Sequence, residues 1–184
     1  ARSASPSESQ SEAARAAVCS VGWDAHLYVP TYKARASRYC TYMEVGWAGP
    51  KRQGDRRALW LGPDESLLMC ADQDAAELHR TLGTQLTDQH FQLTLLSDAL
   101  AVYELNGPYV REILAKGCAL DLHVSVFLPG QCAQSSLERA SVTLMCEEEN
   151  RFRLICRTSF ADYVETWLKD AAIEYGYSVR NRLK

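Results

Sequence analysis

An apolar run, a polar break and an amphipathic segment follow one another twice in this chain, and this repeated pattern constrains the fold most strongly. The first copy covers residues 68–82 and the second covers residues 154–168, and several apolar positions coincide when one is laid on the other. A short apolar run indicates a buried strand, whereas apolar residues spaced three to four apart indicate a helix with one buried face. The pattern therefore predicts an α+β fold of two ferredoxin-like α/β-sandwich units, in which helices cover one face of each antiparallel sheet.

Turn-forming residues and apolar spacing define the other expected elements. Strands are predicted at residues 39–45, 58–61, 66–71, 91–97, 100–105, 132–137, 141–146 and 151–157. Helices are predicted from Asp72 or Asp74 to about residue 86, from 107 to 116, and from 160 to 175. We expect Gly117 to end the second helix in a left-handed conformation, and Ser159 with Asp162 to cap the third.

Three segments follow from this pattern and from the local composition. Residues 1–17 are rich in Ser, Glu, Arg and Ala and are predicted to form a flexible N-terminal tail. Residues 18–90 are predicted to form the first α+β unit, and residues 91–184 the second. A length of 184 residues is sufficient for two small units packed together.

The overall composition argues against several classes of protein. A hydrophobic content of 47% and a charged content of 23% are typical of a soluble globular chain. The net charge of -3 provides no general attraction to nucleic acid or to an anionic membrane, so neither is expected as a partner. No apolar run reaches the ~20 residues of a membrane span, and no apolar signal segment is present. The seven cysteines include no C-x-x-C pair, so we expect buried, reduced thiols in a cytoplasmic protein.

Common catalytic and cofactor motifs are absent from the sequence, so no catalytic, cofactor-binding or metal-ligating residue is expected from motifs alone. The sequence has no dinucleotide-binding G-x-G-x-x-G, no P-loop and no G-x-S-x-G nucleophile motif. Its four histidines lack the spacing of a zinc site.

One loop nevertheless combines the residue types of a catalytic site. Cys118, Asp121 and His123 bring together a thiol, a carboxylate and an imidazole. In an extended segment Asp121 and His123 would point the same way, and a carboxylate that orients an imidazole is common in general acid–base catalysis. The same residues also suit a structural loop, with Asp121 capping backbone N–H groups. Both interpretations remain open at this point.

Four stretches resemble the gamma subunit of heterotetrameric sarcosine oxidase. They are residues 60–68 (WLGPDESLL), residues 105–108 (LNGP) with the helix that continues to KGCALDLH at 116–123, residues 129–132 (PGQC), and residues 153–161 (RLICRTSFA) leading into WLKDAA at 167–172. They occur in the order found in that family between about residues 58 and 176. Residues 1–57 show no clear match.

The resemblance implies a non-catalytic gamma subunit with the fold of the folate-binding part of aminomethyltransferases. Its partners would be the alpha, beta and delta subunits of the same enzyme. The implied holoenzyme oxidatively demethylates sarcosine to glycine, with methylenetetrahydrofolate and hydrogen peroxide as co-products. In that family the large subunits hold FAD, FMN, NAD and tetrahydrofolate, and the delta subunit carries zinc. The gamma subunit is not known to hold a cofactor.

A comparison with aminomethyltransferases argues against folate binding by this chain. Those enzymes carry an Asn-Asp pair in this region; Asp121 falls on the Asp, but Leu120 replaces the Asn. Their Gly-Gly-x-x-Asp-Asp hairpin corresponds to the shorter residues 137–140, and Arg157 replaces a later Asn. Since unmatched buried polar groups cost ~1–3 kcal/mol each, these changes would weaken pterin recognition.

Two alternatives to this function remain. The chain could be a subunit of a related N-methyl amino acid dehydrogenase or demethylase, or a free-standing folate-binding one-carbon protein. A subunit needs an interface, and aromatic residues are enriched at interfaces. Candidate aromatic residues for such an interface are Trp23, Trp47, Tyr28, Tyr32, Tyr39 and Tyr42.

Overall fold

The computed structural model describes residues 16–21, 25–29, 40–44, 56–62, 65–87 and 91–181, the first three ranges by their backbone alone. The strands are β1 (Ala16–Val21), β2 (Ala25–Val29), β3 (Cys40–Glu44), β4 (Arg57–Gly62), β5 (Glu65–Cys70), β6 (Thr94–Leu95), β7 (Leu100–Asn106), β8 (Gln131–Leu137), β9 (Ala140–Glu148), β10 (Arg151–Arg157) and β11 (Tyr177–Asn181). The helices are α2 (Asp72–Gln85), α3 (Val110–Ala115) and α4 (Ala161–Ala172). Short 3-10 turns precede α4 at Thr158–Phe160 and follow it at Ile173–Tyr175.

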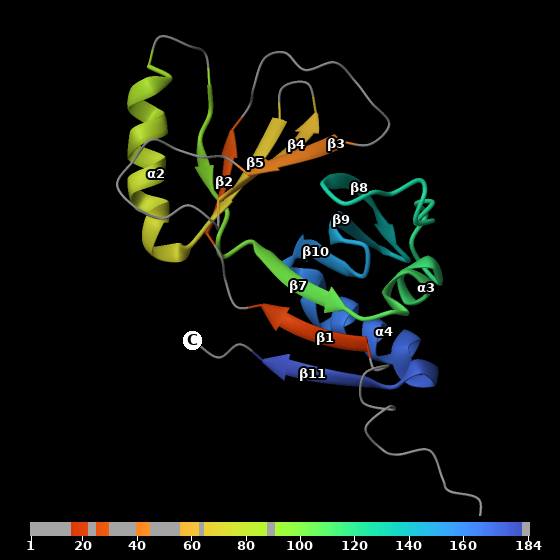
Figure 1. Ribbon diagram of the computed structural model, residues 1–184. Coiled ribbons are helices and arrows are strands. Elements are labelled where there is room, and N and C mark those ends of the chain that lie inside the picture. Colours follow the sequence, from red (N-terminus) through yellow and green to blue (C-terminus); the bar gives the residue numbers. More distant parts are fainter. Residues whose placement is uncertain are drawn as a thin grey trace, which may run out of the picture.

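The described strands form one continuous sheet that folds over on itself. Its strand order is β11-β1-β7-β10-β9-β8-β3-β4-β5-β2-β6. Strand β3 joins the two halves, because its first residues pair with β8 and its last residues pair with β4. In Figure 1, α2 lies beside the half that contains β5 and β2, whereas α3 and α4 lie against the half that contains β7 to β10.

Strand β10 is buried on both faces, which explains its unbroken apolar run. Leu154 and Cys156 pack with Leu168 of α4 on one face. Ile155, which lies between them in sequence, packs with Leu67 of β5 on the other face. Because side chains alternate along a strand, such a run indicates a strand between two buried layers.

Strand β5 repeats this arrangement in the other half of the sheet. Leu67 and Met69 point into the core between the two halves. Leu68 and Cys70 pack on the opposite face with Leu78 of α2. The layers therefore run helix, sheet, sheet, helix, which confirms the expected α+β fold with helices on one face of each sheet.

Strands β1, β2 and β11 lie where the sequence pattern predicts no strand. Ala16 and Ala17, assigned to the flexible tail, pair in β1 with Tyr177 and Ser178 of β11. Strand β1 also pairs with β7, so the segment assigned to the first unit supplies a strand to the sheet of the second. Residues 1–15 lie outside the described residues, and the division at residue 90 stays a prediction.

The expected helix caps are wrong in three places. Ala71 holds the N-cap position of α2, and Asp72 and Asp74 lie in the first turn, where carboxylates favour the helix dipole. Ser159 lies in the 3-10 turn, and no side-chain cap hydrogen bond is formed there or at the start of α4. Among the described glycines, the left-handed conformations belong to Gly107, Gly130 and Gly176, and not to Gly117.

Candidate functional site

The loop between α3 and β8 carries the residues that the sequence singles out. Asp121 and His123 are exposed, and Leu122 between them is buried. Oδ1 of Asp121 accepts a hydrogen bond of 3.0 Å from the backbone N–H of His123. Nδ1 of His123 lies 2.7 Å from Oγ of Ser125. Within the described residues, these contacts support a structural turn, and no hydrogen bond joins the carboxylate to the imidazole.

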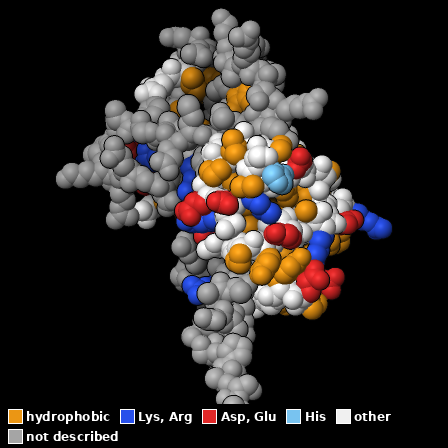
Figure 2. All heavy atoms as spheres, turned by 45° about the vertical axis from the view of Figure 1, so that its right-hand side comes forward, with side chains coloured by type: hydrophobic (Ala, Val, Ile, Leu, Met, Phe, Trp, Pro, Cys, Tyr) orange, Lys and Arg blue, Asp and Glu red, His pale blue; other side chains and the backbone are white. Residues whose placement is uncertain are grey.

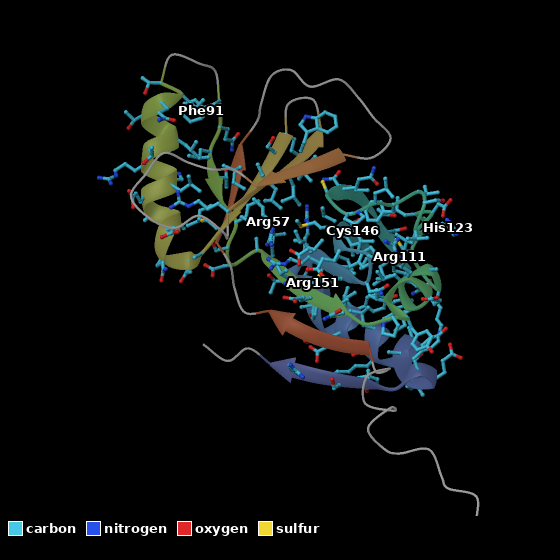
Figure 3. All side chains as sticks on the ribbon, in the orientation of Figure 1. Arg57, Phe91, Arg111, His123, Cys146 and Arg151 are labelled. Atoms are coloured by element: carbon cyan, nitrogen blue, oxygen red, sulfur yellow. The ribbon has the colours of Figure 1, made fainter. Side chains whose placement is uncertain are left out.

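Arg111 of α3 fastens this loop to the protein. Its Nη1 donates hydrogen bonds to the backbone carbonyls of Leu122 at 2.5 Å and Phe127 at 3.1 Å. Its guanidinium lies 4.9 Å from the ring centroid of Phe152, and its Nη2 lies 3.6 Å from Sγ of Cys146. Burial raises the pKa of the Cys146 thiol, although the nearby Arg111 acts in the opposite direction. Figure 3 shows Arg111, Cys146 and His123 at the same end of the molecule.

Cys118, the third member of the candidate constellation, lies apart from the Asp121–His123 turn. Its Sγ is 3.8 Å from Oγ of Ser135, and its backbone forms an isolated bridge with Leu137 of β8. The structure therefore does not bring the thiol, carboxylate and imidazole together through any recorded contact among the described residues.

We expect Asp121→Asn to lower the free energy of unfolding by less than about 0.5 kcal/mol, because the amide keeps an acceptor for the His123 N–H. Asp121→Ala removes that acceptor and should cost about 1 kcal/mol. Chemical denaturation measures both values. If Asp121→Asn abolished the turnover of a purified complex that contains this chain, the catalytic interpretation of the loop would be correct.

A buried ion cluster joins the two halves of the sheet. The Glu147 side chain is 5% exposed and lies 3.0 Å from Arg57, 3.1 Å from Arg151 and 2.9 Å from Arg153. Arg151 also pairs with Glu104 at 3.0 Å. Arg57 comes from β4, whereas the other members come from β7, β9 and β10. Figure 3 shows Arg57 and Arg151 toward the middle of the molecule.

The sequence contains a pattern that predicts this cluster, although the polar residues 147–150 by themselves suggest only a turn. Glu147 is in phase with Met145 of β9, and Arg153 is in phase with Ile155 of β10. Met145 and Ile155 both point into the core between the halves. Opposite charges at inward positions of two neighbouring strands predict a buried ion pair, because a buried charge needs a partner.

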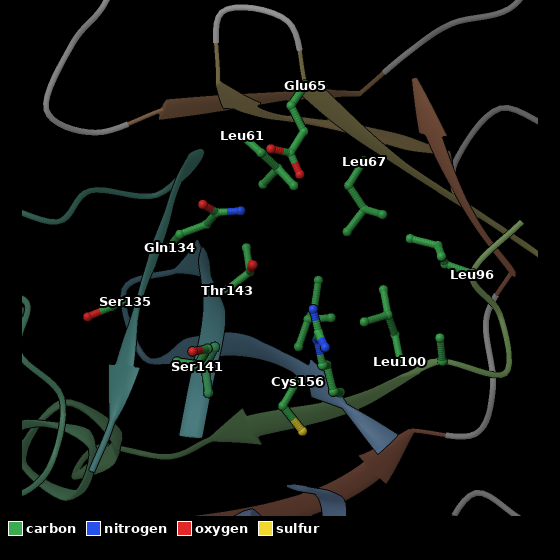
Figure 4. A pocket seen from close by; sticks show the side chains of 14 residues that line it. Leu61, Glu65, Leu67, Leu96, Leu100, Gln134, Ser135, Ser141, Thr143 and Cys156 are labelled. Carbon is green, nitrogen blue, oxygen red and sulfur yellow. The ribbon is translucent and has the colours of Figure 1, made fainter. Parts of the chain in front are cut away.

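An open pocket of about 670 Å³ lies between the two halves of the sheet. Figure 4 shows side chains from both halves facing this space, among them Glu65 and Leu67 on one side and Gln134 and Thr143 on the other. The aliphatic part of the lining includes Leu61, Leu67, Leu96, Leu100 and Ile155. The polar part includes Glu65, Gln134, Ser141, Thr143 and Arg157.

The positions that were compared with aminomethyltransferases fall in different parts of the structure. Arg157 lines the pocket, whereas Asp121 lies in the loop after α3 and is not among the lining residues. Residues 137–140 make the tight connection between β8 and β9, where Glu138 adopts a positive φ of 50°. These residues therefore do not form one site among the described parts of the chain.

Two further features concern residues 16–21, 25–29, 40–44, 56–62, 65–87 and 91–181, which are the described ranges. Within them, no three or more His, Cys, Asp or Glu side chains gather in a way that could hold a metal ion. No helix in those ranges is both long and apolar enough to span a membrane. The aromatic residues proposed for an interface, Trp23, Trp47, Tyr28, Tyr32, Tyr39 and Tyr42, have side chains outside the described ones.

Sequence comparisons point to one family. A family model described as sarcosine oxidase, gamma subunit family, matches residues 49–174. The sarcosine oxidase subunit gamma of Corynebacterium sp. (strain U-96) is 36% identical over 117 residues, which cover 64% of this chain and 56% of that protein. The match thus spans little more than half the length of this curated relative.

Structural comparisons agree with the sequence comparisons. A chain of the heterotetrameric sarcosine oxidase from Corynebacterium sp. U-96, solved in complex with pyrrole 2-carboxylate, has a TM-score of 0.74 and 26% identity, covering 89% of this chain and 86% of that chain. The glycine cleavage system aminomethyltransferase T from Bartonella henselae has a TM-score of 0.64 and 16% identity, covering 94% of this chain and 49% of that chain. The second likeness concerns the fold alone.

Proposed function

We propose that this chain, which belongs to the sarcosine oxidase gamma subunit family, acts as the non-catalytic gamma subunit of a heterotetrameric sarcosine oxidase. Its role is to support assembly with the alpha, beta and delta subunits in the cytoplasm. The assembled enzyme oxidatively demethylates sarcosine to glycine, with methylenetetrahydrofolate and hydrogen peroxide as co-products. FAD, FMN, NAD, tetrahydrofolate and zinc are held by the partner subunits.

The observation that carries this proposal is the extent of the likeness to a chain of a heterotetrameric sarcosine oxidase. That likeness covers 89% of this chain, and the family model covers residues 49–174 within it. The contacts of the Asp121–His123 loop are consistent with a subunit that does no chemistry of its own, because both side chains stabilise a turn.

Purification of the tagged full chain from its native cells tests the proposal. We expect a yellow eluate with flavin absorption bands, larger co-eluting chains, and hydrogen peroxide production when sarcosine is added. A colourless chain without partners, recovered from cells with active sarcosine degradation, would overturn the assignment. Turnover of N-methylglutamate in place of sarcosine, with a dye but not oxygen as electron acceptor, would identify the related dehydrogenase instead.

A partly exposed aromatic pair near the end of α4 is a candidate contact for the other subunits. Tyr109 and Tyr175 stack with their ring centroids 4.8 Å apart, and Nζ of Lys116 lies 4.9 Å from the Tyr175 ring centroid. Ile173, two residues before Tyr175, is 66% exposed. Rigid tyrosines of this kind often dominate interface energetics. Figure 2 shows this end of the molecule, where hydrophobic side chains lie among acidic and basic ones.

We expect Ile173→Glu to reduce recovery of the partner chains in the purification at least tenfold, because it places a charge in the contact. The exposed position should leave the stability of the chain itself within about 0.5 kcal/mol. Leu95→Glu is the matched control, since Leu95 is also an exposed aliphatic residue, at 54%, on the edge strand β6. Equal recovery from both variants would exclude Ile173 from the interface.

A further inference from the structure

Several polar side chains of the pocket between the sheet halves have no partner among the described residues. Glu65 and Arg157 make no ion pair, with each other or with any described residue, although both line the pocket. Gln134 and Thr143 also make no side-chain hydrogen bond among the described residues. Glu65 is half-buried, whereas Arg157 and Gln134 are exposed along the open side of the pocket. The pocket lining thus presents polar groups that could bind a ligand and that have no partner among the described residues.

The two charges have opposite sign, and this restricts the ligand. A ligand with one charge would pair with either Glu65 or Arg157 but not with both. A ligand with both an ammonium and a carboxylate group satisfies both residues, and such charge-assisted hydrogen bonds are stronger than neutral ones. The ligand that fits the charges is therefore a zwitterion.

The remaining lining specifies what lies between the two charged groups. Gln134 can both donate to and accept from an amide, and the hydroxyl of Thr143 can do the same. The opposite wall is aliphatic, with Leu61, Leu67 and Leu96 among its members. Amides flanked by apolar side chains are the features of a short peptide. The volume of about 670 Å³ lies within the range of about 300–1,000 Å³ of sites for ligands larger than a single small amino acid.

The lining carries no activated nucleophile that would favour chemistry over binding. Cys156 reaches the pocket wall, but burial raises its pKa to about 11. At neutral pH its thiol is protonated and therefore a poor nucleophile. Binding without bond making is the function that this lining suits.

We propose that the pocket between the two halves of the sheet, lined by Glu65, Gln134, Thr143 and Arg157, binds short zwitterionic peptides with apolar side chains. Glu65 binds the terminal ammonium group and Arg157 binds the terminal carboxylate. The leucines of the opposite wall contact the side chains of the peptide. This site is independent of the subunit assignment, because it lies wholly within this chain.

Isothermal titration calorimetry of the purified full chain with the tripeptide Leu-Ala-Leu tests this site. We expect saturable binding that weakens about tenfold when the peptide is N-acetylated, and about tenfold when it is C-amidated, since each change removes one charge-assisted contact. Glu65→Gln should abolish the preference for the free ammonium group and keep the preference for the carboxylate. Arg157→Gln should do the reverse.

Each variant is expected to lose one preference and keep the other, which separates loss of a binding contact from misfolding. A misfolded chain would lose the preference for the free ammonium group and the preference for the free carboxylate together. Arg139→Gln is the matched control, because Arg139 is an exposed arginine in the neighbouring connection between β8 and β9 and does not line the pocket. Equal binding of the three peptides, the same loss in Arg139→Gln as in Arg157→Gln, or no saturable binding at millimolar peptide would overturn the proposal.

Discussion

Glu147→Ala is expected to lower the free energy of unfolding by about 3–5 kcal/mol, the largest effect that we predict for a single side chain. The substitution leaves Arg57 and Arg153 without the carboxylate that they share, and their side chains are 13% and 8% exposed. Removing one member of a buried ion pair is costly, because the remaining charge keeps its desolvation penalty and loses its attraction. Guanidinium denaturation of the purified full chain measures the loss.

Glu148→Gln provides the control for this prediction. Glu148 is the next residue and also pairs with Arg151, at 3.3 Å, but its side chain is 69% exposed. Exposed ion pairs contribute about 0–1 kcal/mol, so the control should change stability by less than 1 kcal/mol. A Glu147→Ala variant as stable as Glu148→Gln would show that the cluster does not hold the two halves of the sheet together.

Gly117→Ala is expected to lower the free energy of unfolding by about 1–3 kcal/mol. A Cβ at this position would lie 2.5 Å from Cζ2 of Trp167 and 3.0 Å from Cγ of Glu138. The Trp167 side chain packs against the core on the helix side of the sheet, so it has little room to withdraw. Overpacking therefore shifts the ring or the backbone after α3. Thermal unfolding and the near-ultraviolet circular dichroism of Trp167 report the two effects.

Gly83→Ala is the matched control, because a Cβ on Gly83 would meet no atom within 4 Å. Gly83 lies in the last turn of α2, still within the helix, where alanine is favoured over glycine by up to about 0.5–1 kcal/mol. The two substitutions should thus change stability in opposite directions. If Gly117→Ala were neutral or stabilising, the close approach of Trp167 would not be what requires a glycine at this position.

The central strands could be predicted from the sequence because strands buried on both faces consist of consecutive apolar residues. The run around Leu154 and the run around Leu68 are apolar on both faces, and each is followed by a polar break. Strands β1 and β11 show no such run of apolar residues followed by a polar break. Val179 of β11 is 38% exposed, and among the described strands β11 pairs with β1 alone. A strand of this kind is defined by pairing with a distant segment, which local patterns do not reveal.

The candidate site was harder to predict than the fold, for a related reason. The Asp121–His123 spacing suggested that the side chains share a direction, but the carboxylate turned back to a backbone N–H within the same loop. Short polar side chains often make such local bonds, so spacing alone does not distinguish a turn from a catalytic pair. The pocket was harder still to predict, because Glu65 and Arg157 line one space only when β3 joins the two halves of the sheet.

The position of β1 between β7 and β11 has a consequence for the order in which the sheet can be built. The first described strand finds one neighbour near the middle of the chain and the other among the last described residues. Such distant pairings require a large loss of chain entropy on loop closure before any stabilising contact forms, and this slows folding. The helix-covered β8–β9–β10 meander can assemble from consecutive segments, so it would form first, and β7 would add to it before its other edge pairs with β1. The outermost two strands would then be the last to join and the first to separate.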